Sequence, residues 1–122
     1  MSAPKPAKAM PRPYIPEHGD LVWLSFDPQA GHEQAGRRPA LVLSPASYNR
    51  ASGLMLACPL TTRVKGYPFD VPLPEGLAVS GVIQSDQVRS LDWGQRRAER
   101  IAKAPAAVLA QVLERVGLLL GI

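Results

Sequence analysis

Two short polar segments hold the side chains of this sequence that are best suited to chemistry. GHEQAGRRP offers a carboxylate or an imidazole as a possible base, together with two arginines that could stabilise an anion. TTRVKG adds two threonine hydroxyls that can donate hydrogen bonds. An arginine fork matches phosphate oxygens in geometry and stays charged at all relevant pH, so the set fits attack at a phosphodiester. Its members are Glu33 or His32 as the base, and Arg37, Arg38, Thr61 and Thr62.

RNA would be a suitable substrate for such a set, because its own 2′-hydroxyl can act as the nucleophile. The enzyme then needs only to remove a proton, to stabilise charge on the crowded phosphorus and to protonate the leaving oxygen. The sequence contains no GxSxG, P-loop or HExxH motif and no acidic cluster for magnesium. It therefore predicts chemistry without a bound metal or cofactor. Taken alone, however, segments of this composition are more often solvated connections between strands than catalytic sites.

Short strands must hold the two polar segments, because each segment directly adjoins an apolar run. Residues 20–28 predict a first strand that is closed by Pro28, with Val22, Leu24 and Phe26 on one face and Leu21, Trp23 and Ser25 on the other. PALVLS at residues 39–44 and LMLACPL at residues 54–60 predict a second and a third strand, with Pro59 placing the end of the third near a sheet edge. Residues 45–53 predict a turn that includes one helical turn.

Three further short strands are predicted by FDVPL, VSGVIQS and DQVRSLDW, which are separated by Gly, Pro and Ser/Asp breaks. Short strands at this spacing are typical of a small barrel or sandwich. After Pro105, valines at positions 108, 112 and 116 recur every four residues, which predicts an amphipathic helix that ends near Gly117 or Gly121. Its apolar stripe is wide enough to cover a barrel end and to meet a partner subunit. The two polar segments should converge on one rim of such a barrel.

Length and composition limit the class of protein. A chain of 122 residues with 46% apolar residues fits a single globular domain. Its apolar runs fall well short of a membrane span, and the proline-rich first 16 residues lack the continuous apolar core of a secretory signal. We therefore expect a cytoplasmic protein with no membrane contact. The single cysteine, Cys58, excludes an internal disulfide and is expected to be a small buried hydrophobe.

The net charge of +4 says little about partners until it is divided along the chain. Three basic residues lie in the Pro/Ala/Lys-rich leader at residues 1–13, which we expect to be disordered because it has almost nothing to bury. Without them, basic side chains exceed acidic ones by one. Local groups are more informative, because phosphates could use Arg63 and Lys65 beside the threonines. The basic side chains from Arg96 to Lys103 are expected to form a solvated stretch between the last strand and the helix.

Three longer segments resemble the MazF/PemK family of toxin endoribonucleases, in order and at the family's spacing: GDLVWLSFDPQAGHEQAGRRPALVLSPASYN, CPLTTRVKGYPFDV and SDQVRSLDW. The GDL start, the E-Q-x-G-x-R-P loop, the P-x-T-T segment and the K-G-Y-P turn together make this resemblance specific. It covers residues 14–122 and leaves only the leader outside. It implies an SH3-like small β-barrel with a C-terminal α-helix, the MazF/PemK/CcdB-like toxin fold, which works as a homodimer.

The same resemblance implies the activity. The expected reaction is sequence-specific, metal-independent cleavage of single-stranded mRNA by its 2′-hydroxyl, which leaves a 2′,3′-cyclic phosphate and a 5′-hydroxyl. The chain would be the toxin of a type II toxin–antitoxin system, would inhibit translation and growth, and would be silenced by a cognate antitoxin with an extended, largely acidic segment. No cofactor and no metal ligand is implied.

The family's functional residues match particular positions. The catalytic arginine of R-P falls on Arg38, the catalytic threonine of T-T on Thr61, and the acidic residue of E-Q on Glu33. Arg38 would stabilise charge on the phosphorus, since a pKa above about 12 makes it a poor acid or base. Thr61 would hydrogen-bond the phosphate or the 2′-hydroxyl, and Glu33 would be either a base or the residue that orients Arg38. Further expected RNA contacts are His32, Gln34, Arg37, Arg63, Lys65, Gln84 and Gln87.

One position departs from the family's pattern, and one rival function stays open. Arg37 stands where some relatives have histidine, so a general-acid histidine cannot act at that position. Trp23, inside a predicted strand, is expected to pack rather than to stack on a base. The rival is a non-catalytic toxin of the same fold that binds and poisons DNA gyrase, or a plain protein-interaction barrel. A pure binder would not need Arg38 and Thr61 together with Glu33.

Overall fold

The computed structural model describes residues 14–26 and 36–122. The expectations for the leader at residues 1–13, and for Glu33, His32 and Gln34, concern residues outside these ranges. The described residues form strands, two α-helices and one short 3₁₀ helix, η3. Their bounds are β1 Asp20–Ser25, β2 Arg37–Val42, α2 Ala46–Ser52, β3 Leu54–Thr61, β4 Asp70–Pro72, β5 Val82–Gln84, η3 Ser85–Gln87, β6 Arg89–Asp92, β7 Glu99–Lys103 and α3 Ala106–Leu119.

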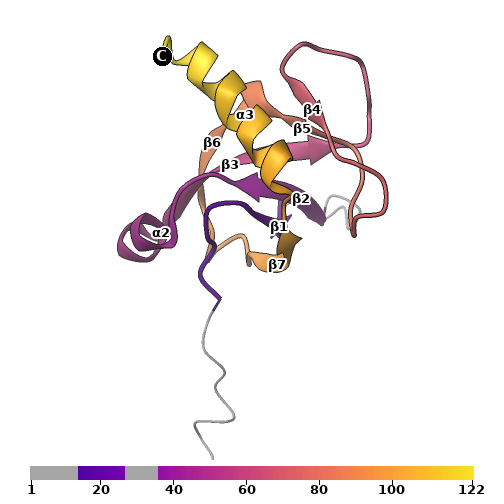
Figure 1. Cartoon of the computed structure of the whole chain (residues 1–122). Helices are drawn as coiled ribbons and strands as arrows, with labels where there is room; N and C mark the ends of the chain where they lie inside the picture. Colours follow the sequence, from indigo (N-terminus) through magenta and orange to yellow (C-terminus); the bar gives the residue numbers. More distant parts are fainter. Residues whose placement is uncertain (1–13, 27–35) are drawn as a thin grey trace, which may run out of the picture.

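The strands form one antiparallel sheet in the order β4-β5-β3-β2-β1-β7, and β6 pairs with the first half of β3. This path is open, with β4 and β7 at its two ends. The six predicted strands and the C-terminal helix are confirmed, and the predicted helical turn is the seven-residue helix α2. Helix α2 lies on the opposite side of the molecule from the connections that follow β3 and β4 (Figure 1).

The expected edge position of Pro59 is wrong, because β3 is the central strand with neighbours on both sides. On one side Pro59 pairs with Ala40 of β2. On the other side β6 pairs with residues 54–57 of β3 and β5 pairs with residues 60 and 61. Proline, which has no N–H to donate, therefore occupies the point where β3 changes partners.

The expected solvated stretch from Arg96 to Lys103 is also wrong, because residues 99–103 form β7 and pair with β1. Arg100 Nε lies 3.5 Å and Lys103 Nζ 3.4 Å from Oδ1 of the buried Asp20, whose other carboxylate oxygen accepts a hydrogen bond from the Tyr14 hydroxyl. Burial and this bond raise the pKa of Tyr14. An edge strand with charged outer positions gives little apolar alternation, so the sequence pattern did not reveal it.

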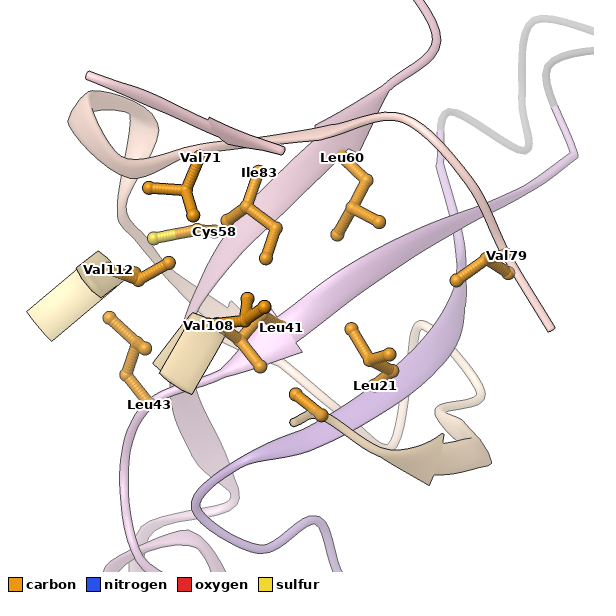
Figure 2. Close-up of a cluster of buried hydrophobic side chains, with 11 residues drawn as sticks. Leu21, Leu41, Leu43, Cys58, Leu60, Val71, Val79, Ile83, Val108 and Val112 are labelled. Carbon is orange, nitrogen blue, oxygen red and sulfur yellow. The ribbon is translucent and has the colours of Figure 1, made fainter. Parts of the chain in front are cut away.

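Both faces of the sheet are buried, which explains the apolar run in β2. One cluster, shown in Figure 2, lies under α3 and includes Leu21 and Leu41. The cluster on the other face includes Val22 and Leu24, so neighbouring residues of β1 point into different cores as the alternation predicted. Cys58 belongs to the first cluster, and burial raises the pKa of its thiol to about 12, which confirms the expected buried hydrophobe.

Helix α3 covers the first cluster with the valine row that the sequence predicted. It begins after Pro105, and Val108 and Val112 are buried. The helix continues through Gly117 to Leu119. Its end exposes large apolar side chains: Leu113, Leu118, Leu119, Leu120 and Ile122. Among the described residues, no helix is long and apolar enough to cross a membrane.

Candidate active site

Arg38 and Thr61 meet at one end of the sheet. The paired residues of β2 and β3 end with Ala40 and Pro59, and Arg38 and Thr61 each lie two residues beyond that pair. Residues two apart along a strand point to the same face, so both side chains lie on the face of Ala40 and Pro59. The predicted convergence of the two polar segments is confirmed for these residues. They share a pocket, which we call the central pocket, lined by Arg38, Pro39, Leu60, Thr61, Thr62 and Arg63.

The Arg38 side chain is available for a ligand. Arg38 is exposed at the start of β2. Within residues 14–26 and 36–122, its guanidinium has neither an ion pair nor a hydrogen bond, whereas those of Arg37, Arg96, Arg100 and Arg115 all bond to protein oxygens. A guanidinium with this freedom can place two N–H groups on a phosphate.

Both the backbone and the side chain of Thr61 make contacts that fix its position. It pairs with Val82 of β5, and its Oγ1 accepts a hydrogen bond from the backbone N–H of Arg63 at 3.1 Å. Since the oxygen accepts this bond, the hydroxyl proton remains free to be donated to a phosphate oxygen. Gly81, just before β5, lies so close that a Cβ there would be 2.3 Å from the Thr61 carbonyl oxygen. The backbone at Thr61 is therefore fixed by tight contacts.

A second pocket, the basic pocket, lies on the other side of Arg38. Arg38 and Leu60 also line the central pocket, so the two pockets adjoin. The guanidinium of Arg96 lies over the Phe26 ring, 5.1 Å from its centroid, and donates to the Ser25 carbonyl oxygen at 3.2 Å. The lining residues are Phe26, Arg38, Pro59, Leu60, Gln84, Arg89 and Arg96.

The two pockets bring together some of the expected RNA contacts and add others. Arg63 lines the central pocket and Gln84 the basic pocket, whereas Lys65 and Gln87 are exposed and line neither. The sequence reasoning missed Phe26 and Arg89 at this place. Arg89 belongs to it only because β6 pairs with β3, a long-range pairing with no local sequence signal.

Metal ligands are not grouped near these pockets. In the described part of the chain, no three His, Cys, Asp or Glu side chains are gathered so that they could hold a metal ion. His18, the one described histidine, donates from Nδ1 to the Leu43 carbonyl oxygen at 2.6 Å. That bond connects the start of the domain to the segment after β2 and gives His18 a structural role.

Comparison with known proteins shows which family the chain belongs to. The family model described as "PemK-like, MazF-like toxin of type II toxin-antitoxin system" matches residues 17–120. The chain belongs to the PemK/MazF toxin family. Among the relatives of this family member, the endoribonuclease toxin MazF of Escherichia coli K12 is 44% identical over 108 residues, which cover 88% of this chain and 96% of the relative.

Solved MazF structures have the same fold as this PemK/MazF family member. A crystal structure of MazF from Deinococcus radiodurans is 64% identical, with a TM-score of 0.81, and the match covers 90% of this chain and 100% of that chain. A MazE–MazF crystal structure from the same organism is 58% identical with a TM-score of 0.82, and covers 90% and 99%. The expected toxin fold with a C-terminal helix is thereby confirmed, with the sheet open rather than closed.

Arg37 differs sharply from its neighbour Arg38 in this family member. Its guanidinium donates to Ser25 Oγ at 2.7 Å, to the Arg97 carbonyl oxygen at 2.8 Å and to Glu99 Oε1 at 3.1 Å. Adjacent strand residues point to opposite faces of the sheet, which accounts for the different surroundings of Arg37 and Arg38. Arg37 connects the start of β2 to β1 and to the β6–β7 connection. Contact of Arg37 with RNA stays a prediction.

Replacing Arg37 with methionine in this PemK/MazF toxin should lower the free energy of unfolding by about 1 kcal/mol, since partly exposed hydrogen bonds contribute modestly. Glu99→Gln, which removes only the charge of an exposed partner, should change it by less than about 0.5 kcal/mol. RNA cleavage by both variants should stay within about tenfold of the wild type at 25 °C, because the free guanidinium of Arg38 is retained. Urea unfolding and a cleavage assay measure both quantities. Wild-type stability together with lost cleavage in Arg37→Met would show instead that Arg37 acts on RNA.

Proposed function

We propose that this chain is an endoribonuclease toxin of a type II toxin–antitoxin system that cleaves single-stranded mRNA at a specific sequence without a metal ion. The observation that carries the proposal is that Arg38, near the start of β2, and Thr61, at the end of β3, line the same pocket. Membership of the PemK/MazF family and 44% identity to an endoribonuclease toxin support the same activity.

The proposed reaction is an attack of the 2′-hydroxyl oxygen on the adjacent phosphorus. The new P–O2′ bond forms as the P–O5′ bond breaks, which leaves a 2′,3′-cyclic phosphate and a 5′-hydroxyl. Arg38 stabilises the negative charge that develops on the phosphorane oxygens, and the Thr61 hydroxyl donates a hydrogen bond to one of them. Glu33, which lies outside the described residues, either takes the 2′-hydroxyl proton or orients Arg38.

Positive charge around the two pockets supports RNA as the ligand and an acidic antitoxin segment as the inhibitor. Arg38, Arg63, Arg89 and Arg96 line the pockets, and among residues 14–26 and 36–122 no aspartate or glutamate lines them. Such complementarity favours binding of a polyanion and competition between two polyanions. Gln84 adds a donor and an acceptor for a base edge, and His32, Gln34, Lys65 and Gln87 are further proposed RNA contacts.

The proposed function also includes an oligomeric state, a protein partner and a cellular location. The exposed leucines at the end of α3 offer an apolar surface, and we propose that the chain acts as a homodimer. The MazE–MazF structures of the Deinococcus relative support a cognate antitoxin as the second protein partner. The proposed place of action is the cytoplasm, where mRNA is translated.

Incubation of the purified protein with long single-stranded RNA in EDTA should yield discrete fragments. Mapping of both ends should give one short cleavage sequence, cyclic phosphates at the 3′ ends and free 5′-hydroxyls. An Arg38→Ala protein prepared in the same way excludes a contaminating nuclease. RNA that stays intact, or that is cut only after magnesium is added, would contradict the proposal. Intact RNA combined with gyrase inhibition would favour the rival toxin of the same fold.

A further inference from the structure

A third pocket continues the row of pockets beyond the central one. It shares Pro39 and Thr62 with the central pocket, as the basic pocket shares Arg38 and Leu60. Its volume is about 330 Å³, and no charged side chain lines it. We call it the tryptophan pocket; its lining residues are Trp23, Pro39, Thr62, Leu77, Ala78, Val79 and Ser80.

The walls of the tryptophan pocket are held by the fold. Trp23 of β1 pairs with Pro39 of β2, and its half-buried indole packs against the core under α3. On the opposite wall, Val79 is buried in the same core and anchors the connection between β4 and β5, as Figure 2 shows. The Leu73 N–H donates to the Gly81 carbonyl oxygen at 3.0 Å, which closes the ends of that connection. The indole therefore presents a fixed surface, as stacking requires.

The order of the pockets matches the alternating chemistry of a single RNA strand. The central pocket offers Arg38 and the Thr61 hydroxyl to a phosphate, and the basic pocket has further arginines on one side of it. The tryptophan pocket on the other side has an aromatic ring, aliphatic side chains and the hydroxyls of Thr62 and Ser80. Bases of single-stranded RNA are free to leave the stack and are commonly held on aromatic rings, while arginines hold the phosphates.

We propose that the tryptophan pocket binds one nucleobase of the RNA strand whose scissile phosphate lies between Arg38 and Thr61. This inference rests on the proposed function. The base stacks on Trp23, and the hydroxyls of Thr62 and Ser80 face its edge. The pocket thus reads one position of the cleavage sequence. Trp23, expected from its strand position to pack, both packs and presents part of its ring to a ligand. An aromatic side chain of an antitoxin is the competing occupant.

The test uses the full-length protein and a short RNA that contains the cleavage sequence mapped in the EDTA experiment. A 2′-deoxy nucleotide at the scissile position removes the nucleophile, so binding is measured without cleavage. A set of such RNAs carries an abasic site at one position at a time. For the wild type, one position near the scissile phosphate should weaken binding by on the order of 10-fold, as expected for the loss of one stacked base.

Trp23→Leu should bind the intact RNA on the order of 10-fold more weakly than the wild type and should lose the response to that one abasic position. Trp23→Phe keeps an aromatic ring and should keep that response. Tyr48→Leu is the matched control, because Tyr48 is an exposed aromatic residue on α2 that lines none of the three pockets. It should leave both affinity and the abasic profile unchanged.

A second readout uses the fact that the chain has only two tryptophans. Trp93 is anchored by its Nε1, which donates to the Asn49 carbonyl oxygen at 2.9 Å. Trp93→Phe leaves Trp23 as the single tryptophan, whose fluorescence should be quenched by the intact RNA and not by the RNA with the critical abasic site.

Several outcomes would overturn the inference. One is a wild-type abasic profile that Trp23→Leu reproduces; another is Trp23 fluorescence that does not respond to RNA. A Trp23→Leu protein that loses affinity for the antitoxin alone would assign the pocket to the antitoxin. In each of these cases the wild type still cuts RNA in EDTA, so the proposed function stands. A wild type that neither binds nor cuts RNA would overturn both.

Discussion

Arg38→Ala is expected to lower the rate of RNA cleavage by about 10²–10³-fold, the usual effect of removing one preorganised donor from a developing anion. The guanidinium has no bond to the described residues and lines one pocket with Thr61, so a phosphate there can reach both residues. Arg38→Lys should recover only part of the loss, because lysine keeps the charge but cannot offer two parallel N–H groups. Thr61→Ala removes the partner donor and should abolish cutting in the same assay.

Stability separates a role in the reaction from a role in folding. Arg38 is exposed and its guanidinium has no bond to the described residues, so Arg38→Ala should unfold at the wild-type urea concentration. Arg50→Ala is the matched control, since Arg50 is an exposed arginine on α2, on the other side of the molecule (Figure 1). It should retain full activity. An Arg38→Ala protein that cuts RNA at the wild-type rate would exclude the site assignment.

Gly81→Ala is expected to lower both the stability of the protein and its rate of RNA cleavage, because the added methyl group displaces Thr61. Gly81 has a φ of +120°, a region open to glycine, and its added Cβ would lie 2.3 Å from the Thr61 carbonyl oxygen. The backbone of β3 or of the β4–β5 connection must move to relieve this overlap. We expect a loss of about 3 kcal/mol in the free energy of unfolding, the upper part of the range for overpacking. Cleavage should fall as well, because Thr61 and the wall of the tryptophan pocket shift together.

Gly76→Ala is the control for the cost of placing alanine at a positive φ without any steric overlap. Gly76 lies in the same connection with a φ of +91°, but a Cβ there meets nothing within 4 Å. Alanine at position 76 should cost about 1 kcal/mol of stability and leave cleavage unchanged. Urea unfolding and the cleavage assay compare the two variants. If Gly81→Ala were as stable and as active as Gly76→Ala, then the contact between Gly81 and Thr61 would not position the site.

Local pattern was sufficient for most of the fold. The alternation of β1 placed Leu21 and Val22 in different cores, and the four-residue spacing of valines in α3 placed Val108 and Val112 in the core. These predictions succeeded because such periods are properties of consecutive residues. Strand β7 was not predicted, because an edge strand buries too few side chains to show a clear apolar period. Pro59 was misplaced because the change of partners along β3 depends on β5 and β6, which follow later in the chain.

For the candidate site, the sequence by itself determined the candidates for chemistry: an R-P arginine, a T-T threonine and a polar loop before an apolar strand. Only the tertiary structure decided where these residues lie and what they contact. It separated Arg37, bound to Ser25 and Glu99, from Arg38, which lines a pocket and has no bond to the described residues. It also placed the basic pocket and the tryptophan pocket next to the central pocket, each sharing two lining residues with it. The physical reason is that a strand's pattern tells which residues share a face, whereas register and partner choice come from contacts between distant segments.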